Sequence, residues 1–316
     1  MRTLATLCVL LLAAAGCTRS NANRIGNLAR SANPQVAMDG SGNGIAVWQE
    51  GGDIVARFFL LATGFGDGEG ITDALENYKP DVAMSVDGSA IVTWVARLAA
   101  GDVLVKARRY SPGRGWESER ILDRGPPSVL DLPAAEFDDP DGAKRYEPVG
   151  SALDPQCPQV AMDDAGNGVV VWARGGRVCA VSYSAGDWSA PIVIDEPPDD
   201  RVGVLPRIAM HPDGAALVTY SIYGDPANVV VEGPTPQFPT QTELDVRGVF
   251  VAEFDPARRS FFVPEVVTTD AWFPERADPD IAVDPSGMFM IVWLRGGVTG
   301  GIRSQTSSLH YRCYRA

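Results

Sequence analysis

The sequence predicts an all-β fold, a five-bladed β-propeller with four antiparallel strands in each blade. Three observations lead to this prediction. A fifteen-residue motif occurs five times in the 316-residue chain, each copy has the pattern of a β-hairpin, and further strand patterns follow every copy. Repeats of roughly 40–50 residues that contain four strands are typical of propeller blades.

The five copies of the motif align without a gap from a proline to an aromatic residue. Every copy has alanine at its fourth position and glycine at its ninth. The copies are PQVAMDGSGNGIAVW from Pro34, PDVAMSVDGSAIVTW from Pro80, PQVAMDDAGNGVVVW from Pro158, PRIAMHPDGAALVTY from Pro206 and PDIAVDPSGMFMIVW from Pro279. This regularity indicates one structural unit that is repeated along the chain.

Each copy is interpreted as two strands joined by a tight turn. Proline is tolerated at the first position of a strand because it has no N–H to donate. A short apolar run follows, then a cluster of Asp, Pro, Ser and Gly typical of turns, then a β-branched run that ends in the aromatic residue. A glycine at one fixed position, such as Gly42, predicts a backbone with positive φ.

Two further strand patterns complete the predicted blade. Third strands are expected at 53–59, 102–110, 177–183, 248–254 and 309–315, and fourth strands at 65–71, 116–122, 188–194 and 261–267. The fifth copy ends after its third strand. An unpaired sheet edge invites aggregation, so we expect residues 23–31 to supply the missing strand and close the ring within the last blade.

The motif Pro-x-Val-Ala-x-Asp, followed by a glycine turn and Val-Val-Trp, resembles bacterial extracytoplasmic propeller repeats of the NHL and sialidase-like kind. The resemblance covers about residues 24–315. It implies a fold rather than an activity, because these families include enzymes, sensors and binding proteins. The Asp-box of sialidases is not reproduced, since Asp87 lies seven residues before Trp94 instead of five.

The N-terminus has the pattern of a bacterial lipoprotein signal. Arg2 precedes an apolar run over 7–15 that is shorter than the roughly 20 residues needed to span a bilayer. The sequence AAGC before and including Cys17 resembles a lipobox, with ordinary secretion as the alternative. We therefore expect a signal peptide over 1–16, lipidation at Cys17, a tether over 17–23, a propeller domain over 24–316, and a place in the bacterial cell envelope facing the periplasm or the exterior.

The net charge and the cysteine content indicate which partners and which disulfide bonds the protein is expected to have. The net charge of −13 argues against nucleic-acid binding, because an acidic surface repels phosphates. Apart from Cys8 and Cys17, three cysteines remain, an odd number. We expect Cys157, Cys179 and Cys313 to be small buried core residues rather than a disulfide framework. The expected partners are the membrane, through the lipid anchor, and an unidentified protein or glycan.

Two repeats carry extra residues, at about 124–156 and 221–247. The first insertion lies between a fourth strand and the next first strand, and the second lies between strands two and three. In a blade of four up-and-down strands, the connection between strands two and three and the connection to the next blade emerge at the same end of the propeller. The closing strand would run from the opposite side, where Cys17 lies, so we expect the looped face to point away from the membrane.

The residue after each repeat proline is polar in all five copies. These residues are Gln35, Asp81, Gln159, Arg207 and Asp280. Each would open an innermost strand on the looped side, so together they would surround the mouth of the central channel. One interpretation is a binding site for a sugar or another polar ligand. The other is a set of solvent-facing residues around a water-filled pore, and we favour it.

No cofactor is expected, although two segments are rich in oxygen ligands. Residues 39–50 carry Asp39, Asn43 and Glu50 at spacings like those of a calcium loop. No other repeat keeps the full set of oxygen ligands, since Arg174 stands at the place of Glu50 in the third copy and Ser85 at the place of Asp39 in the second, so we interpret the segment as a turn. The segment 136–142 contains Glu136, Asp138, Asp139 and Asp141, which suit calcium but equally suit a solvated acidic loop.

The sequence leaves two function classes open. The first is an envelope-anchored binding or scaffold module that uses its loop-rich face, and we favour this non-catalytic class. The alternative is a propeller glycan hydrolase with Asp81 and Asp280 as carboxylates and Arg207 as an orienting cation. His211 and His310 have no spacing that indicates a nucleophile or a histidine-rich metal centre.

Overall fold

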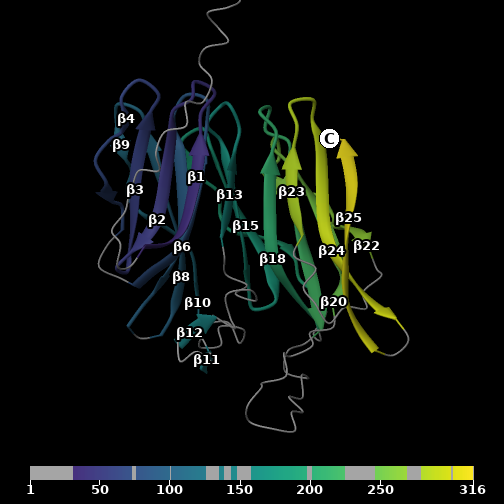
Figure 1. Ribbon diagram of the computed structural model, residues 1–316. Helices are drawn as coiled ribbons and strands as arrows, with labels where there is room; N and C mark the ends of the chain where they lie inside the picture. The colour runs from purple at the N-terminus through teal and green to yellow at the C-terminus, as the bar shows by residue number, and fades with distance from the viewer. Residues whose placement is uncertain are drawn as a thin grey trace, which may run out of the picture.

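The computed structural model describes ten stretches of the chain. They are residues 31–72, 76–99, 101–125, 135–138, 144–147, 158–197, 201–224, 246–268, 279–299 and 302–315. Over these stretches the chain folds into five successive antiparallel sheets that stand side by side as the blades of a β-propeller (Figure 1). The predicted fold class is thereby confirmed. No helix in the described stretches is both long and apolar enough to cross a membrane.

Within a blade the strands pair in sequence order. Blade 1 contains β1 (Ser31–Met38), β2 (Gly44–Glu50), β3 (Asp53–Leu60), β4 (Gly64–Phe65) and β5 (Glu69–Gly70), and blade 2 contains β6 (Glu76–Met84), β7 (Ala90–Arg97), β8 (Val103–Ser111), β9 (Gly115–Trp116) and β10 (Arg120–Gly125). Blade 3 contains β13 (Gln159–Met162), β14 (Gly168–Arg174), β15 (Arg177–Ser184), β16 (Asp187–Trp188) and β17 (Ile192–Asp195). Blade 4 contains β18 (Arg201–Met210), β19 (Ala216–Gly224), β20 (Val246–Asp255), β21 (Ser260–Phe261) and β22 (Glu265–Thr268), and blade 5 contains β23 (Asp280–Val283), β24 (Met288–Thr299) and β25 (Ile302–Arg315).

The fourth strand position of blades 1 to 4 is occupied by two short strands rather than one. In blade 3, for example, β16 and β17 both pair with β15, and three unpaired residues separate them. The predicted fourth strands therefore exist, but each is interrupted after the aromatic residue that begins it.

The repeat turns follow the sequence prediction. The ninth-position glycines all have positive φ, namely Gly42 at 83°, Gly88 at 81°, Gly166 at 79°, Gly214 at 97° and Gly287 at 79°. In the first turn, Asp39 Oδ1 accepts the backbone N–H groups of Ser41 and Asn43, at 2.8 and 2.9 Å. The side-chain amide of Asn43, which donates to Asp39 Oδ2 at 3.0 Å, acts together with these backbone bonds to hold the pKa of Asp39 below its usual value. The stretch that resembles a calcium loop is a hairpin turn fixed by its own aspartate.

The described residues form four hydrophobic clusters, one at each junction between consecutive blades. The aromatic residues at the ends of the last four motif copies contribute to them, and Trp94, Trp172 and Tyr220 are completely buried. The fourth strands contribute one apolar residue each, namely Ile71, Leu122, Ile194 and Val267. Each of these residues packs between its own blade and the next one.

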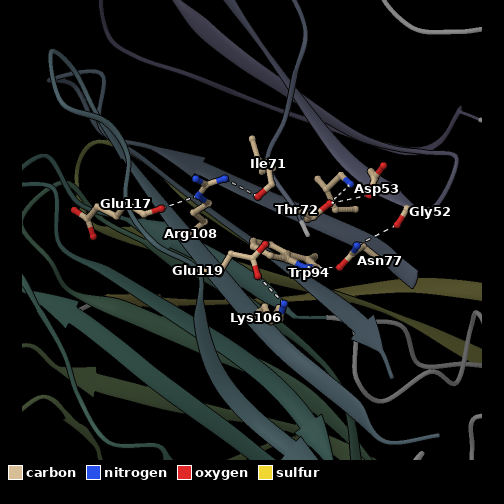
Figure 2. A network of polar contacts seen from close by, with 11 residues as sticks. Gly52, Asp53, Ile71, Thr72, Asn77, Trp94, Lys106, Arg108, Glu117 and Glu119 are labelled. Carbon is tan, nitrogen blue, oxygen red and sulfur yellow. Dashed lines mark hydrogen bonds and ion pairs between the residues drawn. The ribbon is translucent and has the colours of Figure 1, made fainter. Parts of the chain in front are cut away.

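Polar contacts also connect the blades. Figure 2 shows the junction of blades 1 and 2, where Trp94 Nε1 donates to Asn77 Oδ1 and Asn77 Nδ2 donates to the Gly52 carbonyl. In the same region Arg108 donates to the Ile71 carbonyl, at 2.8 Å. Buried polar groups require partners, and here the neighbouring blade provides them.

The described strands of the first predicted insertion and the strand ends that flank the second lie at one end of the propeller. The innermost strands β1, β18 and β23 all point away from that end in Figure 1, while β11 (Ala135–Asp138), β12 (Lys144–Glu147) and the β24–β25 turn lie near it. β11 and β12 form a two-stranded sheet within the first insertion. At the second predicted insertion, β19 continues to Gly224 and β20 begins at Val246, and residues 225–245 lie outside the described residues.

Blade 5 differs from the others, because its described residues form three strands. The predicted closing strand 23–31 lies outside the described residues except for Ser31. That residue pairs with Glu50 in blade 1 and so belongs to the innermost strand. The faces that would meet across this junction expose Val36 and Met38 on blade 1, and Leu309 and Tyr311 on blade 5. We call the region between blades 5 and 1 the seam.

The cysteines only partly match the prediction of small buried core residues. Cys179 packs against the cluster between blades 2 and 3, and burial raises the pKa of its thiol to about 11. Cys313 is exposed, so the prediction is wrong for this residue. It lies on the face of β25 that points into the seam, where no described blade covers it. Cys157 lies outside the described residues.

Candidate functional site

The five polar residues predicted to surround the channel mouth all lie on innermost strands. They also occupy one register position, because each pairs with the residue one before the aromatic of the adjacent strand. The pairs are Gln35 with Val47, Asp81 with Thr93, Gln159 with Val171, Arg207 with Thr219 and Asp280 with Val292. The five residues therefore lie at one level of the propeller, in the half nearer the insertions. We call this set the inner-strand ring.

Asp81 is the most constrained member of the inner-strand ring. Its Oδ2 accepts the backbone N–H of Val160 at 2.8 Å, so the carboxylate of blade 2 contacts the innermost strand of blade 3. Burial raises the pKa of Asp81 to about 6, although N–H groups of Val160 and Val82 and the charge of Arg207 act in the opposite direction. Among the described carboxylic acids whose pKa shift is resolved, Asp81 alone has a raised pKa.

Gln159 and Arg207 continue the ring into blades 3 and 4. Both are half-buried. Gln159 Nε2 donates to the carbonyl of Pro158 at 3.1 Å, and Arg207 Nη1 donates to the carbonyl of Pro206 at 3.3 Å. A guanidinium carries five N–H donors, so this contact leaves most of the donor capacity of Arg207 for another group. The charge of Arg207 reaches Asp81, two blades away.

Gln35 and Asp280 are placed differently from the other three members. Both are exposed, and they lie on the two sides of the seam. Asp280 Oδ1 accepts the N–H of the next residue, Ile281. Asp81 thus contacts the strand that carries Gln159 and is influenced by the charge of Arg207, whereas Gln35 and Asp280 lie on the two blades beside the seam.

Two threonines behind the ring were not singled out from the sequence. Thr93 and Thr219 are completely buried and stand opposite Asp81 and Arg207. Their hydroxyls donate to the carbonyls of Lys106 and Phe250, at 2.8 and 3.0 Å. The sequence did distinguish these two residues, because the fourteenth position of the motif is threonine in these two copies and valine in the other three. The contact with Val160 had no such signal, since every non-proline residue has a backbone N–H.

The described residues contain no group of three or more His, Cys, Asp or Glu side chains placed to hold a metal ion. The acidic segment 136–142 was considered for calcium in the sequence. Glu136 and Asp138 lie on β11, while Asp139 and Asp141 are outside the described residues. The idea of calcium binding at that segment therefore stays untested.

The chemistry available at the ring is hydrogen bonding and proton donation. A carboxyl group with a pKa near 6 is able to switch between donor and acceptor close to neutral pH. Gln159 offers an amide with both donors and acceptors, and Arg207 offers a fixed positive charge. Such a combination suits a ligand with several hydroxyl groups.

Comparisons with known proteins add only a likeness of fold. No family model matches the sequence, and no curated protein is similar to it. A GH93 alpha-L-arabinofuranosidase of Fusarium graminearum in complex with arabinobiose has 12% identity and a TM-score of 0.47, over 85% of this chain and 76% of that one. An alpha-L-arabinanase of Penicillium chrysogenum complexed with arabinobiose has 10% identity and a TM-score of 0.49, over 84% and 75%. A mutant NanB sialidase from Streptococcus pneumoniae has 8% identity and a TM-score of 0.48, over 91% and 60%.

Proposed function

We propose that this protein is an envelope-anchored propeller that binds a carbohydrate at the inner-strand ring. The observation that carries the proposal is Asp81, a half-buried carboxyl of raised pKa that accepts the N–H of Val160, the residue after Gln159, and is influenced by the charge of Arg207. Keeping an ionisable group in such an environment has a free-energy cost, and groups of this kind cluster at functional sites. The environment of Asp81 therefore favours a binding site at the inner-strand ring over a set of solvent-facing residues around a water-filled pore.

Two features favour a carbohydrate over other polar ligands. Carboxyl, amide and guanidinium groups at one level provide both donors and acceptors, which the hydroxyl groups of a sugar can use in pairs. The net charge of −13 disfavours phosphate-rich polymers. Carbohydrates of the cell surface and surroundings are within reach of an envelope protein.

The proposal includes the anchor predicted from the sequence. Lipidation at Cys17 would place the membrane on the side from which the predicted closing strand, residues 23–31, starts. The inner strands run away from the insertions, so an incoming fourth strand runs toward them (Figure 1). The ring and the insertions would then face away from the lipid. Labelling of residues 126–134 on intact cells tests this orientation, and complete protection of that loop would contradict it.

A second candidate is a glycan hydrolase, and one observation favours it. A carboxylic acid with a pKa near 6 is suited to protonate a leaving-group oxygen near neutral pH. Asp280 would be the second carboxylate, at one of the two separations that glycosidases use, roughly 5 Å or 6.5–9.5 Å. Binding with turnover of the ligand would establish this candidate in place of simple recognition.

The test is a glycan array probed with purified residues 18–316, which lack the lipid site. The array includes arabinan oligosaccharides and acidic and neutral surface glycans. We expect binding that falls at least tenfold in Asp81→Asn and in Arg207→Ala, and that is unchanged in Asp187→Asn, an exposed carboxylate on the outer strand of blade 3. Absence of any bound glycan, or equal binding by all four proteins, would contradict the proposal. Release of reducing sugar by the wild type and Asp187→Asn, but not by Asp81→Asn, would identify the hydrolase.

A further inference from the structure

The end of the propeller opposite the insertions carries a group of exposed apolar side chains. Leu60 and Leu61 at the β3–β4 turn are 50% and 68% exposed, Phe65 on β4 is 40% exposed, and Val86 in the β6–β7 turn is 47% exposed. In Figure 1, β4 and the end of β1 lie at the top, away from β11 and β12. We call these four residues the tip patch.

The tip patch lies beside one hairpin turn of blade 1. A Cβ atom on Gly42 would lie 3.3 Å from Leu61 Cδ2, and a Cβ atom on Gly40 would lie 3.8 Å from Val86 Cγ1. Leu61 and Val86 therefore flank the same turn, although they belong to different blades. The Leu61 N–H also donates to Asn43 Oδ1 at 3.1 Å, which joins the two turns of blade 1. The patch thus spans the turns of two neighbouring blades.

The apolar side chains of the tip patch are not a general feature of the blades. Leu61 lies in the turn 61–63, and the equivalent turns are PGR over 112–114, AG over 185–186 and PARR over 256–259. The residues at the motif position of Val86 are Gly40, Asp164, Pro212 and Pro285 in the other copies. A blade therefore does not require leucine or valine at these places. Single exposed apolar residues are ordinary on a protein surface, whereas a contiguous group indicates an interaction site.

The proposed function, on which this inference rests, indicates which partner is available at this end. It places the lipid anchor and the bilayer on the side of the propeller away from the insertions. The tip patch belongs to that side, and three of its four residues lie on blade 1, the first described blade after Cys17. Because the anchor would hold the protein at a bilayer, a lipid surface is permanently within reach of the patch.

The charges beside the patch indicate the kind of lipid surface. The four described turns at this end of blades 1 and 2 carry two carboxylates, Asp39 and Asp87, and one cation, Arg114. Attraction to anionic lipids is a property of clustered basic residues, and these turns do not contain such a cluster. Burial of apolar side chains is then the main contribution to binding. A zwitterionic surface suits this patch better than an anionic one.

We propose that the tip patch inserts into the interfacial region of the bilayer to which the protein is anchored. Leu60, Leu61, Phe65 and Val86 leave water for the boundary between headgroups and acyl chains, where binding strength increases with the apolar area that is buried. This contact adds to the lipid anchor and fixes the orientation of the propeller on the membrane. The inner-strand ring then opens away from the lipid.

Vesicle sedimentation tests the contact in the absence of the anchor. The parent protein is the complete mature chain with Cys17→Ser, and the vesicles contain phosphatidylcholine and phosphatidylethanolamine. The test variant combines Leu61→Glu with Phe65→Glu. The matched control combines Ile121→Glu with Val193→Glu. These residues are apolar and similarly exposed, at 54% and 50%, but lie on the outer strands of blades 2 and 3.

We expect the parent protein to sediment with the vesicles, the test variant to bind them about tenfold more weakly, and the control variant to stay within about twofold of the parent. Added phosphatidylglycerol is expected not to strengthen the binding. Circular dichroism verifies that both variants are folded.

Three results would overturn the proposal. They are no sedimentation of the parent protein, an equal loss in both variants, and binding that phosphatidylglycerol strengthens and the test variant retains. A dimer in light scattering that only the test variant dissociates, without vesicle binding, would overturn it as well and would assign the patch to a second copy of the chain.

The outcome is distinguishable from that of the glycan array. If vesicle binding fails while glycans still bind at the inner-strand ring, the membrane contact alone is wrong. If vesicle binding depends on the tip patch while no glycan binds, the carbohydrate proposal alone is wrong. Both assays use proteins without the lipid, so neither result depends on acylation of Cys17.

Discussion

The junction of blades 2 and 3 and the seam between blades 5 and 1 are built from equivalent strands, yet only the junction is filled by described residues. At the junction Trp172 is fully buried and its Nε1 donates to Asp123 Oδ2 at 2.8 Å. Arg174 binds the same carboxylate. At the seam Tyr311 and Leu309 face outward from β25. The comparison shows that the fourth strand of the preceding blade supplies both buried apolar surface and polar partners at a described junction.

The aromatic residues that end the repeat motif differ in their polar partners. Trp172 and Tyr220 donate to Asp123 and Asp195, each of which directly follows the buried residue of the preceding blade's fourth strand. Trp94 and Trp48 donate instead to side chains of their own blades, Asn77 and Glu50. A bond to the preceding blade is therefore a feature of the junctions before blades 3 and 4.

The largest effect is expected where the junction is best packed. Trp172→Ala removes a buried indole that touches two blades, so we expect it to lower the free energy of unfolding by about 3–5 kcal/mol. Urea denaturation monitored by circular dichroism measures the change. A loss below about 1 kcal/mol would show that the junction is not packed as described.

The seam is tested by a smaller substitution. If Ile25 fills the seam as Ile71 fills the first junction, Ile25→Ala and Ile71→Ala will each lower the free energy of unfolding by about 2–4 kcal/mol. The same urea titration is used for both variants. If Ile71→Ala lowers the free energy of unfolding by the expected amount but Ile25→Ala lowers it by less than about 0.5 kcal/mol, the prediction that Ile25 fills the seam is wrong.

Because of Asp81, we expect the stability of the folded protein to depend on pH. Its folded pKa of about 6 lies above that of a free carboxyl group, so the folded state holds this proton more tightly than the unfolded chain. The resulting stability is complete below about pH 4 and is lost as the pH rises through 6. Asparagine does not ionise and still offers an oxygen to the Val160 N–H.

We therefore expect Asp81→Asn to be more stable than the wild type at pH 7.5, by about 3 kcal/mol at most, and to match it near pH 4. Urea titrations of both proteins at the two pH values measure this difference. A stability gap that does not change with pH would show that Asp81 titrates normally.

The smallest expected effect concerns a turn. Asp163 is buried and binds both the backbone N–H and the side-chain amide of Asn167, each at 2.8 Å. Asp163→Ala leaves these donors without their acceptor and should cost about 1–2 kcal/mol in urea. Asp187→Asn, far from any turn bond of this kind, should stay within about 0.5 kcal/mol of the wild type. Equal stabilities of the two variants would contradict this assignment.

The repeated motif predicted the fold well because the residues of each copy favour, by their local conformational preferences, the same hairpin that the blade contains. Proline, turn glycine and terminal aromatic fix the ends of the hairpin, so the register that aligns Gln35 with Asp280 also followed from the sequence. The burial of Asp81 did not follow, because it depends on the approach of a backbone N–H from another blade. The exposure of Cys313 was also missed, since burial of a strand face depends on what lies beside it.

Hydrogen exchange tests the central claim, that the fifth junction is constructed like the other four. The measurement compares amide protection over 309–315 in β25 with protection over 248–254 in β20, in the mature chain and in a variant that lacks residues 18–28. We predict equal protection in the mature chain and a loss confined to β25 and β1 in the variant. Rapid exchange over 309–315 in the mature chain, unaffected by the deletion, would contradict the account.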